Sequence, residues 1–495
     1  MKLVKSLILG SAATLVAMGG AQAADLPLKA KAVEYVKVCS LYGAGFYYIP
    51  GTDTCIKLGG YLRVDTSFNA SGAYDRPAWD GAAGQNNRLK NDYVARSRFD
   101  MNVDTRTATE YGVVRTYADF TMNWTTGSGQ IAGFDPVGGL GVYYAFIQFA
   151  GFTMGKAVSQ FSTPWTGYPG NNTSFLIGGE DDVTGINQFA YTAQFGNGVS
   201  ASISLEDASA YRQSGVYNVS GATAAGVLAG VPGVNSYAGV SVPDIVGQLR
   251  VDQAWGLFQL SVAAHQVRAS YYNPALETSG HPGDTWGFAV QGGLSLKNLP
   301  TGPGDSINLT VSYANGASRY VIGGVSPNSF AMYGGSSALG IYNTVAFGAS
   351  ADGVFGGTSA ANGTGIEKST LWGVRGAFNH NWDAYWSSSL FGSYSSVSWG
   401  QNGKDLICAG MANAIAGRGV TYSCDPNFTI AQVGAVTRWT PVKNLTFSGE
   451  VMYTWLNQKN EGFFNANPGA TKPVANYEFK NQGTLTVGVR AQRNF

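Results

Sequence analysis

The sequence contains little charge. Charged side chains make up 12% of the 495 residues, and 31 lysines and arginines stand against 30 acidic residues. A chain this close to neutral lacks the basic excess that binds a phosphate backbone. We therefore expect no nucleic acid among its partners.

Histidine is scarce, which restricts the chemistry available. The three histidines, His265, His281 and His380, stand far apart in the sequence, and none belongs to a metal-binding helix motif. No Ser-His-acid set can be assembled from their spacing. We expect no catalytic residues, no metal site, no cofactor and no enzymatic activity.

Long apolar runs are missing beyond the first 20 residues, which excludes a helical membrane protein. At the N-terminus, Lys2 and Lys5 precede the apolar run "SLILGSAATLVAMGG", and "AQA" follows it. This order of basic, apolar and small residues is typical of a secretory signal peptide. We expect residues 1–23 to be cleaved after Ala23 and the mature chain to cross the inner membrane.

Cysteine is also rare. The four cysteines form two groups of equal separation, Cys39 with Cys55 and Cys408 with Cys424. In an oxidising compartment such groups favour local disulfides, although the sequence alone does not fix the pairing. Zinc ligation is the alternative, and the lack of closely spaced cysteines or a nearby histidine argues against it.

What the sequence has in quantity is glycine, with 68 residues, and a fine alternation of polar and apolar side chains. In "ARSRFDMNVDTR" (95–106) the odd positions are mostly apolar, and the even positions are arginine, aspartate or asparagine. Successive side chains of a strand point to opposite faces. The pattern therefore predicts a strand with one apolar and one charged face. The stretches "IKLGGYLRVDTSF" and "TLTVGVRAQRNF" alternate in the same way.

About sixteen such strands can be placed, many of them long enough to cross a bilayer at a tilt. Short turns alternate with long segments rich in glycine, serine, alanine and asparagine, as in an up-and-down outer-membrane barrel. Lipid would cover the apolar face, and a water-filled lumen would meet the polar one. The expected strands lie near 55–68, 92–104, 110–124, 141–150, 151–158, 187–195, 199–206, 244–254, 257–268, 285–297, 306–314, 370–381, 385–398, 429–440, 445–456 and 482–495.

Tryptophans near the expected strand ends fit interfacial aromatic girdles, although any single one could be an ordinary packing residue. They are Trp124, Trp255, Trp286, Trp372, Trp382, Trp386, Trp439 and Trp455.

Two stretches carry a family resemblance. Residues 36–65, "VKVCSLYGAGFYYIPGTDTCIKLGGYLRVD", resemble the start of the alphaproteobacterial general porin family, and "VGVRAQRNF" is similar to the last strand of outer-membrane barrels. The resemblance implies a trimeric porin of sixteen strands whose third outer loop folds into the pore. It also implies that Phe495 is part of the assembly signal read by the barrel insertion machinery.

The expected bore is wide and needs narrowing. Sixteen strands about 4.8 Å apart and tilted by roughly 40° give a backbone diameter of about 32 Å. The segment at about 159–186 is long enough to enter the lumen and return. It carries three consecutive acidic residues, Glu180, Asp181 and Asp182, beside the glycine pair Gly178 and Gly179. We expect this segment to be the constriction loop.

Basic residues on the polar faces of the first three strands offer the opposite charge. Arg63, Arg96, Arg98 and Arg115 are expected to form a basic wall that faces the acidic segment and sets up a transverse field. Arginine suits such a wall because it stays charged in a narrow passage. The alternative is that the acids decorate a solvated loop, while the arginines form salt bridges with aspartates of the same wall.

The expected organisation is an N-terminal periplasmic segment at 24–54 followed by a barrel at 55–495. The expected function is passive diffusion of small hydrophilic solutes and ions through the outer membrane of a Gram-negative bacterium. A substrate-selective uptake channel and a structural or adhesive surface barrel remain as alternatives. Expected partners are outer-membrane lipid, lipopolysaccharide, the insertion machinery and two further copies of the chain.

Overall fold

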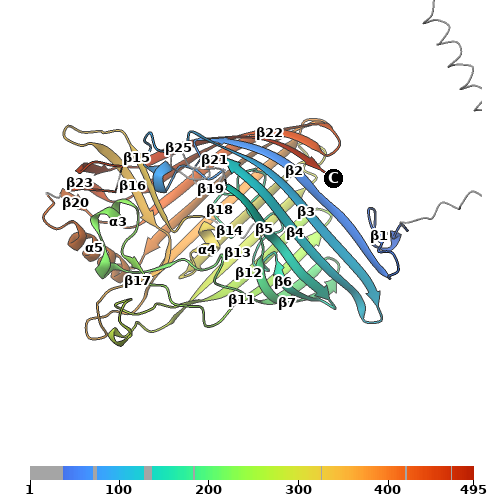
Figure 1. The fold of residues 1–495 in the computed structure, drawn as a ribbon, viewed down its shortest axis with the longest axis horizontal. Helices are drawn as coiled ribbons and strands as arrows, with labels where there is room; N and C mark the ends of the chain where they lie inside the picture. The colour runs from blue at the N-terminus through green and yellow to red at the C-terminus, as the bar shows by residue number, and fades with distance from the viewer. Residues whose placement is uncertain are drawn as a thin grey trace, which may run out of the picture.

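Sixteen antiparallel strands close into a barrel in the computed structural model, which describes residues 37–70, 75–126, 137–181, 184–324, 326–418, 421–469 and 471–495 (Figure 1). All sixteen predicted strands are present, with ends shifted by a few residues. They are β2 (Thr54–Phe68), β3 (Tyr93–Thr109), β4 (Gly112–Thr126), β5 (Val137–Phe149), β6 (Phe152–Ala157), β7 (Ile186–Gly196), β8 (Val199–Glu206), β11 (Asp244–Gln253), β12 (Gly256–Val267), β13 (Thr285–Lys297), β14 (Ser306–Asn315), β18 (Glu367–Asn381), β19 (Trp386–Trp399), β21 (Phe428–Val442), β22 (Leu445–Gln458) and β25 (Gln482–Asn494).

The first and last barrel strands close the sheet. β2 pairs with β25 in an antiparallel register that sets Arg63 opposite Gln492 and Asp65 opposite Arg490. Hydrocarbon cannot hydrogen bond with a sheet edge, so a spanning sheet must close on itself. The same pairing brings polar side chains from both ends of the chain to one place on the inner wall.

Connections alternate in length, as the sequence predicts. At one end of the barrel the turns are short, such as Asn197–Gly198 between β7 and β8, where both residues have positive φ (49° and 73°). Asn-Gly is the preferred pair for such a turn because both central residues must be left-handed. At the other end the connections are long. The segment 158–185, which joins β6 to β7, is the one expected to act as the constriction loop.

Outward-facing apolar side chains are exposed on the barrel. On β2 these include Leu58, Leu62 and Val64, each 45–51% exposed, while the neighbouring Asp65 is 1% exposed. The apolar and charged faces of the sequence are therefore the outer and inner faces of the barrel. All eight tryptophans predicted for the girdles are 39–66% exposed.

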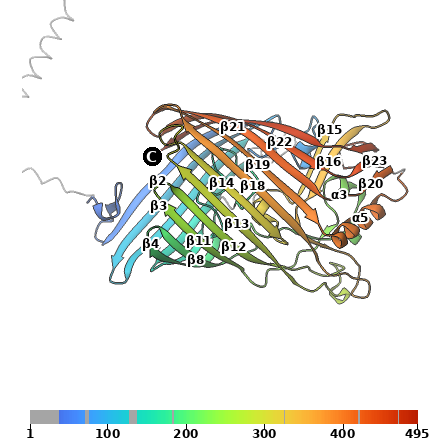
Figure 2. The ribbon, with the colours of Figure 1, turned by 180° about the vertical axis from the view of Figure 1, so that it is seen from behind.

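The long connections carry a second layer of structure at the barrel end opposite β1 and the C-terminus (Figure 2). A five-stranded sheet has the order β15-β16-β24-β23-β20, in which β16 and β24 are parallel. The elements outside the barrel wall are η1 (Ser40–Tyr42), β1 (Tyr47–Tyr48), α2 (Gly81–Gly84), β9 (Gly215–Asn218), η2 (Val219–Gly221), α3 (Ala224–Leu228), β10 (Val234–Asn235), η3 (Glu277–Ser279), α4 (Arg319–Ile322), β15 (Ser329–Gly334), β16 (Asn343–Ala349), β17 (Ala351–Phe355), α5 (Gln401–Ile415), β20 (Thr421–Ser423), β23 (Glu461–Ala466) and β24 (Ala475–Phe479).

The longest helix of the described residues is α5, with 15 residues. Within the described ranges, no helix has both the length and the apolar character needed to span a membrane.

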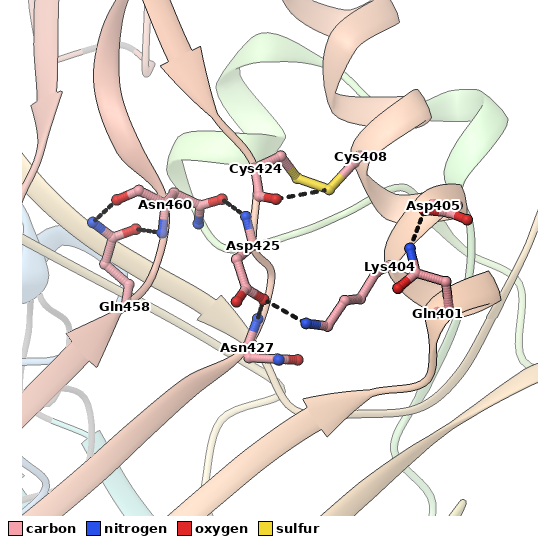
Figure 3. The surroundings of a disulfide bond; sticks show 9 residues. All are labelled: Gln401, Lys404, Asp405, Cys408, Cys424, Asp425, Asn427, Gln458 and Asn460. Atoms are coloured by element: carbon pink, nitrogen blue, oxygen red, sulfur yellow. Dashed lines mark hydrogen bonds and ion pairs between the residues drawn. A yellow bond between two sulfur atoms is a disulfide. The ribbon is translucent and has the colours of Figure 1, made fainter.

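Both expected disulfides are present. Cys408 of α5 is bonded to Cys424, and beside this bond Lys404 contacts Asp425 at 3.3 Å (Figure 3). Cys39 is bonded to Cys55 of β2, which ties the described part of the N-terminal segment, residues 37–53, to the barrel. The signal peptide expected at residues 1–23 lies outside the described residues.

The two faces of β12 give a test of the barrel assignment. Val262 points outward and is 47% exposed, so Val262→Arg would place a charge in hydrocarbon near the middle of the strand. We expect a loss of about 2–4 kcal/mol in unfolding free energy, measured by urea titration in lipid vesicles. The control is Val240→Arg, since Val240 is 42% exposed but lies outside the strands. Equal effects of the two substitutions would contradict the lipid-facing assignment.

Candidate functional site

A buried arginine on the barrel wall binds the segment 158–185. Arg375 of β18 is 1% exposed, and its guanidinium donates to the backbone oxygens of Thr166 (2.7 Å), Leu176 (3.1 Å), Gly179 (3.3 Å) and Glu180. Hydrogen bonds to a charged donor contribute about 1.5–3 kcal/mol each, more than neutral ones. One side chain therefore fixes two separate parts of the segment.

Other inward polar side chains bind the same segment. Gln432 of β21 accepts from the Ile177 N–H at 2.9 Å and donates to the Phe175 oxygen at 2.9 Å. Glu450 of β22 accepts from the Thr173 N–H at 2.9 Å. Further bonds to the segment come from Gln248, Gln259, Asn308, Asn379, Arg438 and Arg490. These residues belong to β11, β12, β14, β18, β21 and β25, so one side of the inner wall is occupied by the segment.

The glycine pair at 178–179 permits this close approach. Gly178 has a φ of 104°, and a Cβ at that position would lie 2.6 Å from the Val374 oxygen. A Cβ on Gly179 would lie 3.0 Å from the Thr310 side chain. The two glycines therefore let the backbone of the segment lie flat against β14 and β18.

An apolar cluster fills part of the space inside the barrel. It joins side chains of the segment, such as Phe161 and Ile177, to Trp79 and Phe330 from other long connections. Inward-facing residues of the wall complete it, namely Val246, Ala263, Ala289, Ala314, Leu371, Val397, Phe428, Ile430 and Leu456. The alternation in the sequence predicts a polar inner face, and this cluster is an exception to it. The inner wall is apolar here because the long connections pack against it.

Glu180 belongs to a buried triad. Arg212, which follows β8, contacts Glu180 at 2.5 Å and Glu206 at 3.4 Å, and all three side chains are 0% exposed. Ser162 donates to Glu180, and Ser159 donates to Glu206 at 2.6 Å. The Glu180 carboxylate is thus paired with Arg212, which is not one of the predicted wall arginines on the first strands.

Of the other two acids of the segment, the structure describes Asp181. Asp181 is 2% exposed, and it lies close enough to Arg375 to interact with it electrostatically. Asp182 lies outside the described residues.

Two of the predicted wall arginines, Arg96 and Arg115, form salt bridges with aspartates of the same wall. Arg96 of β3 contacts Asp65 at 2.6 Å, and Arg490 of β25 contacts the other oxygen of Asp65 at 2.6 Å. Arg115 of β4 contacts Asp104 at 3.0 Å, as does Arg106. Each aspartate is therefore bound by two guanidinium groups.

Arg63 and Arg98 stand directly opposite each other in the register of β2 and β3. The Nε of Arg63 donates to the side-chain oxygen of Gln492 at 2.7 Å, and that of Arg98 donates to Asn123 at 2.5 Å. Both arginine side chains are partly exposed. Like charges opposite each other in a sheet cost stability, and Asp100, which interacts electrostatically with both arginines, offsets part of this cost.

The three histidines lie apart from one another. His265 is fully buried, with Nδ1 2.8 Å from Asp244 and Nε2 3.6 Å from Asp352. Since both ring nitrogens face carboxylates, neither is placed against a hydroxyl nucleophile. His380 contacts Asp305 at 2.7 Å beside a short turn.

At the end of the chain, the ring of Phe495 stacks on Phe99 at 5.9 Å between centroids.

Comparison with known proteins gives consistent matches. The family model described as the Porin subfamily matches residues 25–488. Porin Omp2b of Brucella canis is 35% identical over 277 residues, which cover 53% of this chain and 66% of that protein. Porin Omp2b of Brucella melitensis is 34% identical over 276 residues, with the same coverage. The aligned part thus spans slightly less than two thirds of these relatives.

Among solved structures, the outer membrane channel DcaP of Acinetobacter baumannii is similar in fold, with a TM-score of 0.56 and 15% identity over 90% of this chain and 99% of that chain.

Removing the Arg375 guanidinium should loosen the segment 158–185. Arg375→Ala would leave the carbonyls of Thr166, Leu176 and Gly179 without these donors, and we expect the free energy of local opening to fall by about 1.5–3 kcal/mol. Hydrogen exchange would then rise tenfold or more in residues 166–180 and stay unchanged in β2 and β3. Arg250→Ala is the matched control, because Arg250 contacts Asp252 at the far end of β11. Unchanged exchange in the segment would contradict the anchoring role.

Proposed function

The chain belongs to the porin subfamily, whose model matches residues 25–488, and from this premise we propose that it is an outer-membrane channel for passive diffusion. Small hydrophilic solutes and ions would cross through water inside the barrel. The barrel supplies a lipid-facing outer surface and a polar inner wall, which is the requirement for such a channel.

The observation that carries the proposal is the unequal covering of the inner wall. Segment 158–185 binds to the inner faces of β11 to β14, β18, β21, β22 and β25, whereas Arg63, Arg98, Arg106 and Arg115 on β2 to β4 remain partly exposed. We propose that solutes pass between the segment and this basic wall. The segment then narrows the bore without closing it.

The acidic residues of the segment have an anchoring role in this proposal. Glu180 pairs with Arg212, and Asp181 lies near Arg375, so both help to hold the segment in position. The arginines of β2 to β4 present the charge that a passing solute meets. Arginine keeps its charge in a partly desolvated passage, so the wall would act in the same way across the physiological pH range.

General diffusion fits better than uptake of one selected sugar. Of the aromatic residues that could form a sugar-binding track, Tyr42, Tyr47, Tyr48, Trp165 and Tyr168, most contact other parts of the protein. Trp165 donates to Thr310 at 3.0 Å, and Tyr42 and Tyr48 pack against the Cys39–Cys55 disulfide. The long outer connections remain compatible with a surface role, but they do not require one.

We further propose a homotrimer in contact with outer-membrane lipid and lipopolysaccharide, with Phe495 read by the insertion machinery. These assignments rest on family membership. Chemical cross-linking in native membranes should give a ladder that ends at three copies, and a ladder that ends at one copy would contradict the trimer.

The channel proposal predicts ion conductance. Purified, folded protein added to a planar bilayer should produce stable steps whose size rises with salt concentration, since the current would flow through water-filled lumens. Liposomes that contain the protein should swell in small sugars and not in large ones. Protein that migrates as a folded barrel on unheated gels but passes no ions would overturn the proposal.

A further inference from the structure

We propose that the passage prefers anions, and that the arginines of β2 to β4 select small solutes bearing carboxylate or phosphate groups. This inference rests on the proposed channel function and deepens it. It follows from which charged groups of the lumen reach water and which are covered.

The carboxylates of this wall are covered. Asp65 is 1% exposed and lies between Arg96 and Arg490, and the Asp104 side chain is 10% exposed and lies between two further arginines. The Asp104 cluster contains one negative and two positive charges, so it retains a net charge of about +1 at neutral pH. In the Asp65 cluster, Arg490 also interacts electrostatically with Glu450, which is buried. Asp100 and Asp119 lie beside each other on the same wall and are 3% and 8% exposed.

The arginines of the same wall reach the lumen. The side chains of Arg106 and Arg115 are 29% and 27% exposed, nearly three times the exposure of the Asp104 that they share. Arg63 and Arg98 are also partly exposed. Water and solutes in the passage therefore meet guanidinium groups more than carboxylates.

The segment 158–185 does not restore the balance. Glu180 is 0% exposed and shares Arg212 with Glu206, which is also 0% exposed, while Asp181 is 2% exposed and lies near Arg375. Their charges are directed into the protein on the side away from β2 and β3. The transverse field expected from the sequence is thus replaced by a wall of one dominant sign.

Two places along the path suit an anion. Arg63 and Arg98 face each other across β2 and β3 beside the buried Asp100, and they donate to Gln492 and Asn123. Both arginine side chains are partly exposed, whereas Asp100 is 3% exposed, so an anion in the passage would meet the arginines. Arg106 and Arg115 line a hollow of about 520 Å³ beside the short β3–β4 and β5–β6 turns. A guanidinium group can donate two parallel hydrogen bonds to the two oxygens of a carboxylate or phosphate group. Weak binding at successive arginines along the path would therefore favour the passage of anions.

The test is the zero-current potential of the purified protein in a planar bilayer under a tenfold potassium chloride gradient. We expect a zero-current potential whose sign indicates that chloride is more permeant than potassium. The chloride-to-potassium permeability ratio should fall as the salt concentration rises, because salt screens the charge of the wall. The double variant Arg63→Gln/Arg98→Gln should lower the chloride-to-potassium ratio about threefold or more. Arg493→Gln is the matched control, since Arg493 is exposed at the outward face of β25.

Each outcome points to one conclusion. Steady conductance with potassium preference would overturn the anion inference and leave the channel in place. Chloride preference that the double variant does not change, in protein that still migrates as a folded barrel, would overturn the role of Arg63 and Arg98. The absence of conductance in folded wild-type protein would overturn the channel function itself.

Discussion

The need to satisfy every backbone hydrogen bond in hydrocarbon is the constraint on which this structure depends. It requires the sheet to close, and closure is achieved by the pairing of β2 with β25. Closure has a second effect, because it aligns Asp65 with Arg490 and Arg63 with Gln492 across the seam. The polar residues at the two ends of the chain thus become one charged surface inside the barrel. The same constraint that seals the wall therefore assembles the basic side of the lumen.

The position of the segment 158–185 in the lumen depends on where its backbone N–H and C=O groups find hydrogen-bond partners. A chain that leaves the wall must find partners for its N–H and C=O groups, and here the partners are side chains of the opposite wall. Arg375 supplies four bonds to carbonyls, while Gln432 and Glu450 supply bonds to N–H groups. These three partners lie on β18, β21 and β22, and further bonds to the segment come from β11, β12, β14 and β25. On β2 to β4, the side chains of Arg63, Arg98, Arg106 and Arg115 stay partly exposed.

The sequence predicts the strands well and the lumen only in part. All sixteen strands are predictable because lipid and water impose alternation on each of them separately. The partners of the segment are not, because Arg375 and Arg212 lie 195 and 32 residues from Glu180 and carry no local signal. The inward position of Phe428 and Ile430 is hard to predict for another reason. A strand that contributes to an inward apolar cluster is apolar on both faces, so the alternation in its sequence is weaker. Arg96, Arg115 and Glu180, which the sequence predicts on two sides of the passage, each have a nearer partner of opposite charge.

The placement of charge follows from the cost of burying a carboxylate. A buried carboxylate needs charged or hydrogen-bonding partners, and an arginine with five donors can serve two acceptors at once. Asp65 and Asp104 each have two arginines, and Glu180 shares Arg212 with Glu206. On the wall, more arginines than aspartates take part in these contacts. The arginines beside Asp104, which are Arg106 and Arg115, are more exposed than the aspartate. In the segment fewer cations than anions take part, but serine hydroxyls and backbone N–H groups supply the remaining bonds and the whole cluster is covered. The sign of the charge that lines the proposed passage therefore depends on which charged clusters are buried. The numbers of acidic and basic residues in the sequence do not determine it.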